Sequence, residues 1–374
     1  CRQAQALCAW VVGPLVGLLA LATPARASVF ELFGGDPRGI AMAGALVAAT
    51  EGAEAAFYNP AALVEAPTNG MQIGFAQTHL PMDIHLIRPV CSDDAATCRA
   101  RFGRQSSRHA PLLPEGGRHF QLGWHARHLR VLGGRLAFGA LLTLPSTRLV
   151  RLSGPDAAQP HFVVYESLPD RLSVLLASGI RINDRVAVGV GVQVLAALGS
   201  ELDLGLDPAT GRIEPGTVQI SLQPSASLTA GVSLRPGFGL RLGLGFRQEV
   251  SLRYRIPTRL GVGPLLAADL LVAQNTLYSP TTLELGAAWR SQDNRVLIAA
   301  SVRMAMWSEA PDPSPRLEID IGGGVAGDIG VDEQFDIGRD TAQRSPGFGD
   351  TVTPAVAAEL WPKERLCVRG GYSF

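Results

Sequence analysis

The chain has 374 residues, in which 33 Lys and Arg balance 33 Asp and Glu, so its formal net charge is zero. Nucleic-acid partners normally meet a basic excess gathered on one face, and this balanced composition argues against that class of protein. Its Cys and His residues do not form pairs at metal-ligand spacing, so no metal site is expected. Nothing in the residues implies a cofactor.

Residues 1–27 are predicted to be a cleaved export signal. An apolar run at 7–22 follows Arg2, and it is shorter than the roughly 18 residues that a membrane-spanning helix needs. Ala25 and Ala27 supply the small residues that an export peptidase reads, so cleavage after Ala27 is expected. No Cys follows the apolar run directly, and a lipid anchor is therefore not expected.

From residue 70 onward, apolar and polar side chains alternate with the period of β-strands. In 185–199 the Val residues share one face, whereas small residues such as Gly189 and Gly191 share the other. In 238–254 the Leu and Phe residues occupy one face and the charged residues the other. The pattern predicts eleven strands, at 70–80, 118–131, 134–149, 169–182, 185–203, 216–234, 238–255, 279–290, 295–308, 349–361 and 364–374.

Strand length separates the two all-β architectures that fit this alternation. A secreted β-sandwich would have strands of about 5 to 6 residues. Several runs here reach the roughly 9 to 11 residues that cross a membrane. Short turns at one end and long polar connections at the other are typical of an outer-membrane barrel, with apolar side chains toward lipid. The fold class predicted for 70–374 is therefore a transmembrane antiparallel β-barrel in a Gram-negative-type outer membrane.

The strand count is odd, whereas bacterial single-chain barrels have an even number of strands. We therefore expect that the sequence is truncated at its C-terminus. The alternative is that Phe374 is a natural terminal aromatic residue and that the count is in error.

Cys91 and Cys98 flank a polar stretch in the long connection after the first strand. An exported protein folds in an oxidising compartment, so we expect a disulfide between them, which leaves Cys367 unpaired. Six charged residues are predicted to face the lumen, where ion pairs with an interior plug are the favoured role and contact with a carboxylate ligand is the alternative. They are Arg241, Arg247, Glu249, Arg253, Arg290 and Arg303.

The segment ahead of residue 70 contains a series of short motifs: Phe33-Gly34-Gly35, Arg38-Gly39, Ala41-Met42-Ala43-Gly44-Ala45 and Phe57-Tyr58-Asn59-Pro60-Ala61-Ala62-Leu63. Further motifs of the same set lie at residues 240–250 and in a hairpin at 350–360 and 365–374. These motifs resemble the FadL/TodX family of outer-membrane transporters of long-chain fatty acids and aromatic hydrocarbons. Asn59-Pro60-Ala61 is the most recognisable of them.

The resemblance implies a fourteen-stranded barrel in which residues 28–69 fold inside the lumen as a hatch. It further implies that Phe30, Phe33 and Phe57 contact an apolar substrate. A kink in the third strand of family members opens the wall sideways, and Pro145 falls in that strand. The alternative for Pro145 is a position at the end of the strand, where it enters its loop, because Pro is disfavoured inside a sheet.

The function predicted from these features is passive transport of a hydrophobic small molecule, gated by the hatch and followed by lateral release. The protein is expected to be monomeric and surrounded by outer-membrane lipid and lipopolysaccharide. No phosphate-binding glycine loop or Gly-x-Ser-x-Gly elbow is present, so no enzyme is expected. Two alternatives remain open, a non-transport scaffold for a secretion or assembly machinery and a general polar porin.

Overall fold

The computed structural model describes residues 36–77, 118–127, 134–146, 172–207, 212–214, 218–262, 266–312, 316–322, 347–363 and 366–374. Several predictions lie outside these residues, namely the export signal, Phe30, Phe33 and the disulfide between Cys91 and Cys98. Within the described part of the chain, no helix is both long enough and apolar enough to cross a bilayer.

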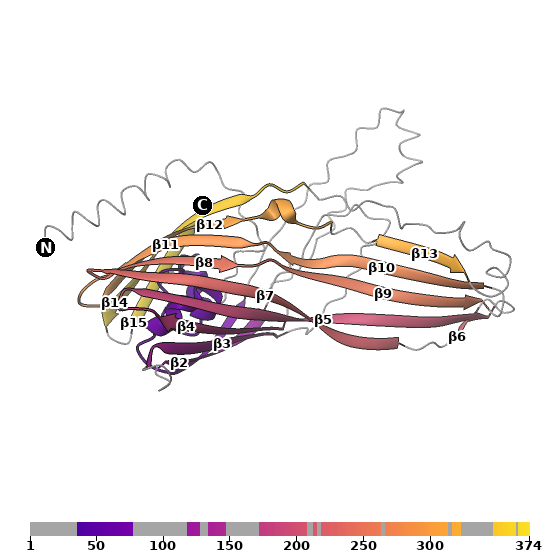
Figure 1. Ribbon diagram of the computed structural model, residues 1–374, viewed down its shortest axis with the longest axis horizontal. Coiled ribbons are helices and arrows are strands. Elements are labelled where there is room, and N and C mark those ends of the chain that lie inside the picture. The colour runs from indigo at the N-terminus through magenta and orange to yellow at the C-terminus, as the bar shows by residue number, and fades with distance from the viewer. Residues whose placement is uncertain are drawn as a thin grey trace, which may run out of the picture.

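Eleven strands form the wall of the molecule, each antiparallel to its neighbour along the path β1-β2-β3-β4-β5-β7-β8-β11-β12-β14-β15 (Figure 1). Each of them overlaps one of the predicted strands, although the bounds of several differ. Their bounds are β1 (Gly70–Gln77), β2 (Arg118–Arg127), β3 (Leu136–Pro145), β4 (Ser173–Arg181), β5 (Val186–Asp207), β7 (Val218–Gly237), β8 (Leu240–Arg247), β11 (Thr282–Arg290), β12 (Val296–Ala305), β14 (Thr351–Lys363) and β15 (Leu366–Ser373).

Four further strands extend the sheet beyond the wall, on the right of Figure 1: β6 (Arg212–Glu214), β9 (Val250–Val262), β10 (Leu266–Ser279) and β13 (Arg316–Gly322). β9 lies parallel to β5 and antiparallel to β10, which in turn pairs with β13. The single strand predicted at 238–255 is therefore wrong, because β8 ends at Arg247 and β9 begins at Val250. The alternation predicts no strand in 256–278, because Pro257 and the continuous apolar run near 270 interrupt the two-residue period.

The wall has an inner and an outer face, as the alternation predicts. On β5, Ala187 and Gln193 are buried at 2% and 1% exposure, whereas Val190 on the opposite face is 63% exposed. Exposed large apolar side chains recur on the outer face of neighbouring strands, including Leu228 and Leu285. An outward apolar band of this kind is typical of a lipid-facing barrel surface.

The segment of residues 36–66, named here the inner segment, packs against the inner face of the wall. It contains α2 (Pro37–Ala41), α3 (Ala55–Tyr58) and the 3₁₀-helix η1 (Pro60–Glu65). α2 begins after Asp36, whose carboxylate accepts hydrogen bonds from the backbone N–H groups of Arg38 and Gly39. Pro37 at the first helical position is pre-organised for this start.

The inner segment also lies where the wall path ends. Among the described strands, β1 and β15 are the two ends of the path, and no pairing joins them. α2 contacts both of these strands, while η1 contacts β2, β3, β4, β5 and β7. The inner segment thus touches strands along the wall path, with α2 against both end strands.

We expect Leu285→Arg to impair assembly, because it places a guanidinium on the outer apolar face in the middle of β11. Charges on the lipid side of such strands cost about 2–4 kcal/mol near the membrane midplane. Chemical unfolding of the protein refolded into liposomes would measure the loss, and Leu285→Met serves as the control. Equal stability of the two variants would contradict a lipid-facing outer surface.

Candidate functional site

A row of glycines crosses the inner face of the wall where the inner segment touches it. Gly179 of β4 is paired with Gly189 of β5, Gly189 with Gly231 of β7, and Gly231 with Gly245 of β8. None of these positions has room for a side chain. A Cβ on Gly179 would lie 2.7 Å from the carbonyl oxygen of Pro60, and one on Gly245 would lie 2.6 Å from that of Tyr58.

The Asn59-Pro60-Ala61 motif lies on this glycine row, defined as Gly179, Gly189, Gly231 and Gly245. A Cβ on Gly189 would overlap the backbone of Pro60 and Ala61, and one on Gly231 would overlap the Asn59 side chain. The backbone of the inner segment therefore approaches the backbone of the wall directly, because the residues between them lack side chains.

Asn59 is fully buried, and its amide group makes three hydrogen bonds. Nδ2 donates to the carbonyl oxygen of Val47 at 2.8 Å and to that of Val232 on β7 at 3.1 Å. Oδ1 accepts from the Ala61 backbone N–H at 3.2 Å, which caps η1. One side chain thus connects two parts of the inner segment to the wall, and Pro60 fixes the first residue of η1.

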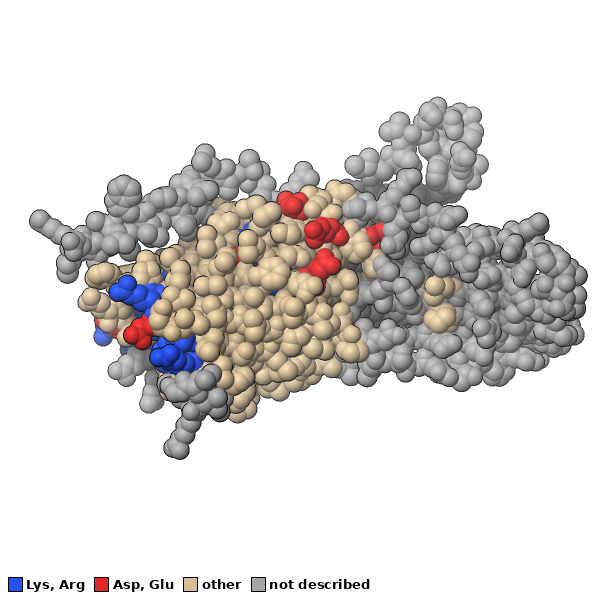
Figure 2. All heavy atoms as spheres, in the orientation of Figure 1, with Lys and Arg blue, Asp and Glu red and all other residues tan. Residues whose placement is uncertain are grey.

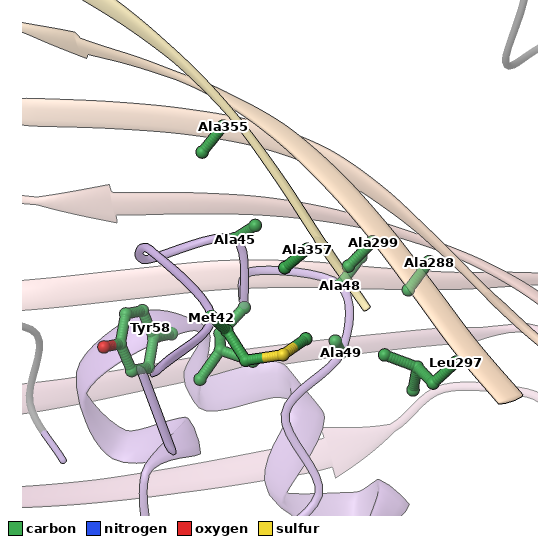
Figure 3. Close-up of a cluster of buried hydrophobic side chains, with 11 residues drawn as sticks. Met42, Ala45, Ala48, Ala49, Tyr58, Ala288, Leu297, Ala299, Ala355 and Ala357 are labelled. Atoms are coloured by element: carbon green, nitrogen blue, oxygen red, sulfur yellow. The ribbon is translucent and has the colours of Figure 1, made fainter. Parts of the chain in front are cut away.

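Two apolar clusters fill the space between the inner segment and the wall. Figure 3 shows the first, in which Met42 and Tyr58 lie among small side chains of β11, β12 and β14 such as Ala299. The second joins Leu63 and the alanines of α3 and η1 to β3, β4 and β5. Phe57 is half-buried and packs against both clusters, so it lies between them. Its ring is covered by the guanidinium of Arg247 at 4.3 Å, a cation–π contact.

Two acidic side chains of the inner segment pair with arginines of the wall. Glu51 binds Arg241 of β8 at 2.6 Å and Arg290 of β11 at 2.8 Å. Glu65 pairs with Arg235 of β7 and lies 3.8 Å from Arg181 of β4. These four arginines lie beside the short turns that join neighbouring strands.

Arg38 and Glu359 form the most buried of these ion pairs. The guanidinium of Arg38 donates to both carboxylate oxygens of Glu359, at 2.8 and 2.9 Å, and to Glu54 and the Ala49 carbonyl oxygen. Glu359 has no exposed surface and also accepts from Arg369 of β15 at 2.6 Å. Removing one partner of a buried pair leaves an unpaired charge, so this network strongly favours one position of α2 against the wall.

The charged residues predicted to face the lumen have different partners in the structure. Arg241 and Arg290 pair with the inner segment as expected, whereas Arg303 pairs with Glu284 inside the wall. Glu249 accepts from the Tyr278 hydroxyl, and the side chain of Arg253 lies outside the described residues.

Pro145 is the last residue of β3, opposite His119, and the ladder continues through Ser146, which donates to the Arg118 carbonyl oxygen.

Sequence reasoning missed the acidic partners Glu51, Glu65 and Glu359 and also Arg38 as an ion-pair donor. Their positions in the chain carry no periodic signal, since each partner lies on a distant element. The glycine row had a detectable signal, because Gly189 was predicted to face the lumen. Its alignment with Gly179 and Gly231 needed the strand register.

Comparisons with known proteins agree with this architecture at the level of fold. No protein-family model matches the chain, and no curated protein matches its sequence. Among solved structures, a TodX variant, the deltaS2S3 mutant of a monoaromatic hydrocarbon channel, is 15% identical with a TM-score of 0.53, over 92% of this chain and 84% of that one. The P. putida toluene transporter TodX is 16% identical with a TM-score of 0.49, over the same shares of the two chains.

The monoaromatic hydrocarbon channel CymD is 12% identical, with a TM-score of 0.48 over 92% of this chain and 84% of that one. The wall and the inner segment define the class of molecule as an antiparallel β-barrel with a packed interior segment. More particularly, the chain has the FadL/TodX fold, as the motifs ahead of residue 70 implied.

We expect Gly231→Val to displace the inner segment while the wall still forms, because the new side chain would overlap Asn59. Overpacking of this kind costs about 1–3 kcal/mol. Hydrogen exchange of residues 55–66 would measure the effect as lost protection. Gly370→Val on β15 is the control, since a Cβ there has no neighbour within 4 Å. Unchanged protection in Gly231→Val would contradict the close approach.

We also expect the inner segment to become less stable as the pH rises. Burial, followed by the nearby Glu54 carboxylate, raises the pKa of Asp36 from 3.8 to about 7. The packed state therefore holds this proton more tightly than the unfolded chain. Its contribution is complete below about pH 4 and is lost as the pH rises through about 7.

Thermal unfolding of the detergent-solubilised protein at pH 5 and pH 8 would test this expectation. The melting temperature of the wild type should fall more between these pH values than that of Asp36→Asn. Asp184→Asn, in an exposed turn, is the matched control and should behave as the wild type. An equal fall in Asp36→Asn and the wild type would assign the pH dependence to other groups.

Proposed function

We propose that this protein transports a hydrophobic small molecule, such as a long-chain fatty acid or an aromatic hydrocarbon, passively across the outer membrane. The carrying observation is the fit of Asn59-Pro60-Ala61 onto the glycine row, inside a wall whose outer face is apolar. The fold is that of a hydrocarbon channel variant, which supports the same reading. The short turns would face the periplasm, as in other bacterial barrels.

In this proposal the inner segment is the hatch. It contacts strands from β1 round to β15 and therefore occupies the interior that a general polar porin would need to keep open. The hatch is held in position by hydrogen bonds of Asn59 and by ion pairs, and these contacts break and re-form more readily than a covalent link. A small shift of the hatch would open a path between Phe57 and the wall.

The proposed route begins at the long connections and passes an apolar contact at Phe57, the described member of the set Phe30, Phe33 and Phe57. Phe57 lies between two apolar clusters and beneath Arg247, so a substrate meets it next to the hatch motif. Lateral release near Pro145 is the proposed exit, because a proline at the end of β3 has no backbone N–H to donate to a neighbouring strand.

We expect Asn59→Ala combined with Pro60→Ala to impair uptake while the wall still assembles. The double change removes three hydrogen bonds of the Asn59 amide and the fixed start of η1. Each lost bond leaves a buried group unpaired at about 1–3 kcal/mol. Uptake of radiolabelled oleate and of toluene by cells would be measured, with heat-modifiable migration as the check on assembly.

Pro67→Ala combined with Thr68→Ala is the matched control, because both residues are exposed just beyond η1. Unchanged uptake in the Asn59 and Pro60 variant would remove the hatch from the mechanism. Pro145→Ala should reduce uptake if the wall opens at β3. Normal uptake in that variant alone would place the exit elsewhere and leave transport standing.

A further inference from the structure

A cavity of about 600 Å³ lies at the short-turn end of the wall, between the β7–β8 and β11–β12 hairpins. Arg235, Arg241 and Arg290 line it together with the turn residues of both hairpins. Figure 2 shows Lys and Arg side chains gathered at this end of the molecule, whereas tan surface covers the strands. The cavity is separate from the apolar clusters that surround Phe57.

The arginines of this cavity have more donors than the neighbouring acids use. Glu51 serves both Arg241 and Arg290, and Glu65 serves Arg235. Nε of Arg235, Nη1 of Arg241 and Nε of Arg290 are buried without a hydrogen-bond partner among the described residues. The positive charge at the cavity comes from the accessible parts of the three side chains, which are 33%, 18% and 21% exposed and, among the described residues, face only the two acids Glu51 and Glu65.

The acid of the neighbouring turn bonds within its own turn. Asp293 Oδ1 accepts hydrogen bonds from the Ser291 hydroxyl and from the Arg295 backbone N–H. An anion that entered the cavity would therefore compete with Glu51 alone for Arg241 and Arg290. Guanidinium groups bind carboxylates, and Glu51 already bridges these two arginines with one carboxylate oxygen on each.

An aromatic side chain lies on the other side of the cavity. Phe238 occupies the β7–β8 turn with φ of 56° and remains 69% exposed. A left-handed backbone is unusual for a bulky residue, and hairpins of this type normally place Asn or Asp there. The next residue, Gly239, is pressed against the Arg290 carbonyl oxygen, where a Cβ would overlap. The turn thus holds an apolar ring beside the arginines, and strained residues of this kind gather at binding sites.

We propose that this cavity binds a small organic carboxylate, whose oxygens replace Glu51 on Arg241 and Arg290 while its apolar part contacts Phe238. Binding would release both ion pairs through which Glu51 holds the inner segment to the wall. The inference goes beyond transport, because the site and its competition with Glu51 exist whether or not the protein carries a hydrocarbon. An anion of the right shape at the short-turn side would then loosen the inner segment.

The test titrates the purified full chain in nonionic detergent with three probes, followed by isothermal calorimetry. Benzoate carries both a carboxylate and a ring, toluene carries the ring alone, and inorganic phosphate carries the charge alone. Benzoate should bind saturably and at least about tenfold more tightly than phosphate, since phosphate gains nothing from Phe238. Phosphate that binds as tightly as benzoate, or benzoate that does not saturate, overturns the proposal.

Two variants should shift benzoate affinity in opposite directions. Arg290→Gln should weaken it about tenfold through the lost charged hydrogen bonds. Glu51→Gln should tighten it, because the competing carboxylate is gone, and misfolding cannot produce a gain in affinity. Arg295→Gln, an exposed arginine in the adjacent turn, is the control and should leave affinity unchanged. Glu51→Gln with unchanged or weaker benzoate binding overturns the competition.

Toluene separates this proposal from the transport proposal. Toluene should not displace benzoate from the purified protein if the cavity recognises the carboxylate. Toluene that competes with benzoate would mean that the cavity belongs to the transport route, which overturns a separate carboxylate site. Absent toluene uptake in the wild type would contradict transport and leave the benzoate result to stand by itself.

Discussion

The direct contact of two backbones, at Asn59-Pro60-Ala61 and the glycine row, is the constraint on which the interior of this protein depends. Only residues without a Cβ let the inner segment come so close to β4, β5 and β7. At that distance the Asn59 amide reaches the Val232 carbonyl oxygen, and the alanines of α3 and η1 can pack against the wall. A larger side chain anywhere along the row would change all of these contacts together.

The ion pairs add orientation to this close packing. Charged groups removed from water are costly unless they are paired and hydrogen-bonded, and Glu51 and Glu65 of the inner segment, like Glu359 of β14, meet that condition through arginines of other elements. Glu359 is the clearest case, with Arg38 and Arg369 sharing its two oxygens. The same network connects α2 to β14 and β15, at one end of the wall path. Apolar packing alone would permit the inner segment to slide, whereas these directional contacts specify one position.

Alternation in the sequence was sufficient to find the wall, because one face of each strand is apolar and the other small or polar. Val190 and Ala187 illustrate the rule within a single strand. The rule failed in 256–278, where β9 and β10 leave the wall and pair with each other. Apolar and polar residues do not alternate in the sequence there, so the two-residue period that identified the other strands is weak.

The sequence by itself determined the strand periodicity, the division at residue 70 and the presence of a compact Ala-rich segment with the Asn59-Pro60-Ala61 motif. These are local properties, and the backbone of a few neighbouring residues is enough to produce them. Only the tertiary structure decided which residues the segment touches. The alignment of Gly179, Gly189 and Gly231 depends on strand register, and the meeting of Glu51 with Arg241 and Arg290 depends on contacts between elements nearly 200 or more residues apart. Such pairings arise from packing in three dimensions, for which the order of residues along the chain carries no periodic signal.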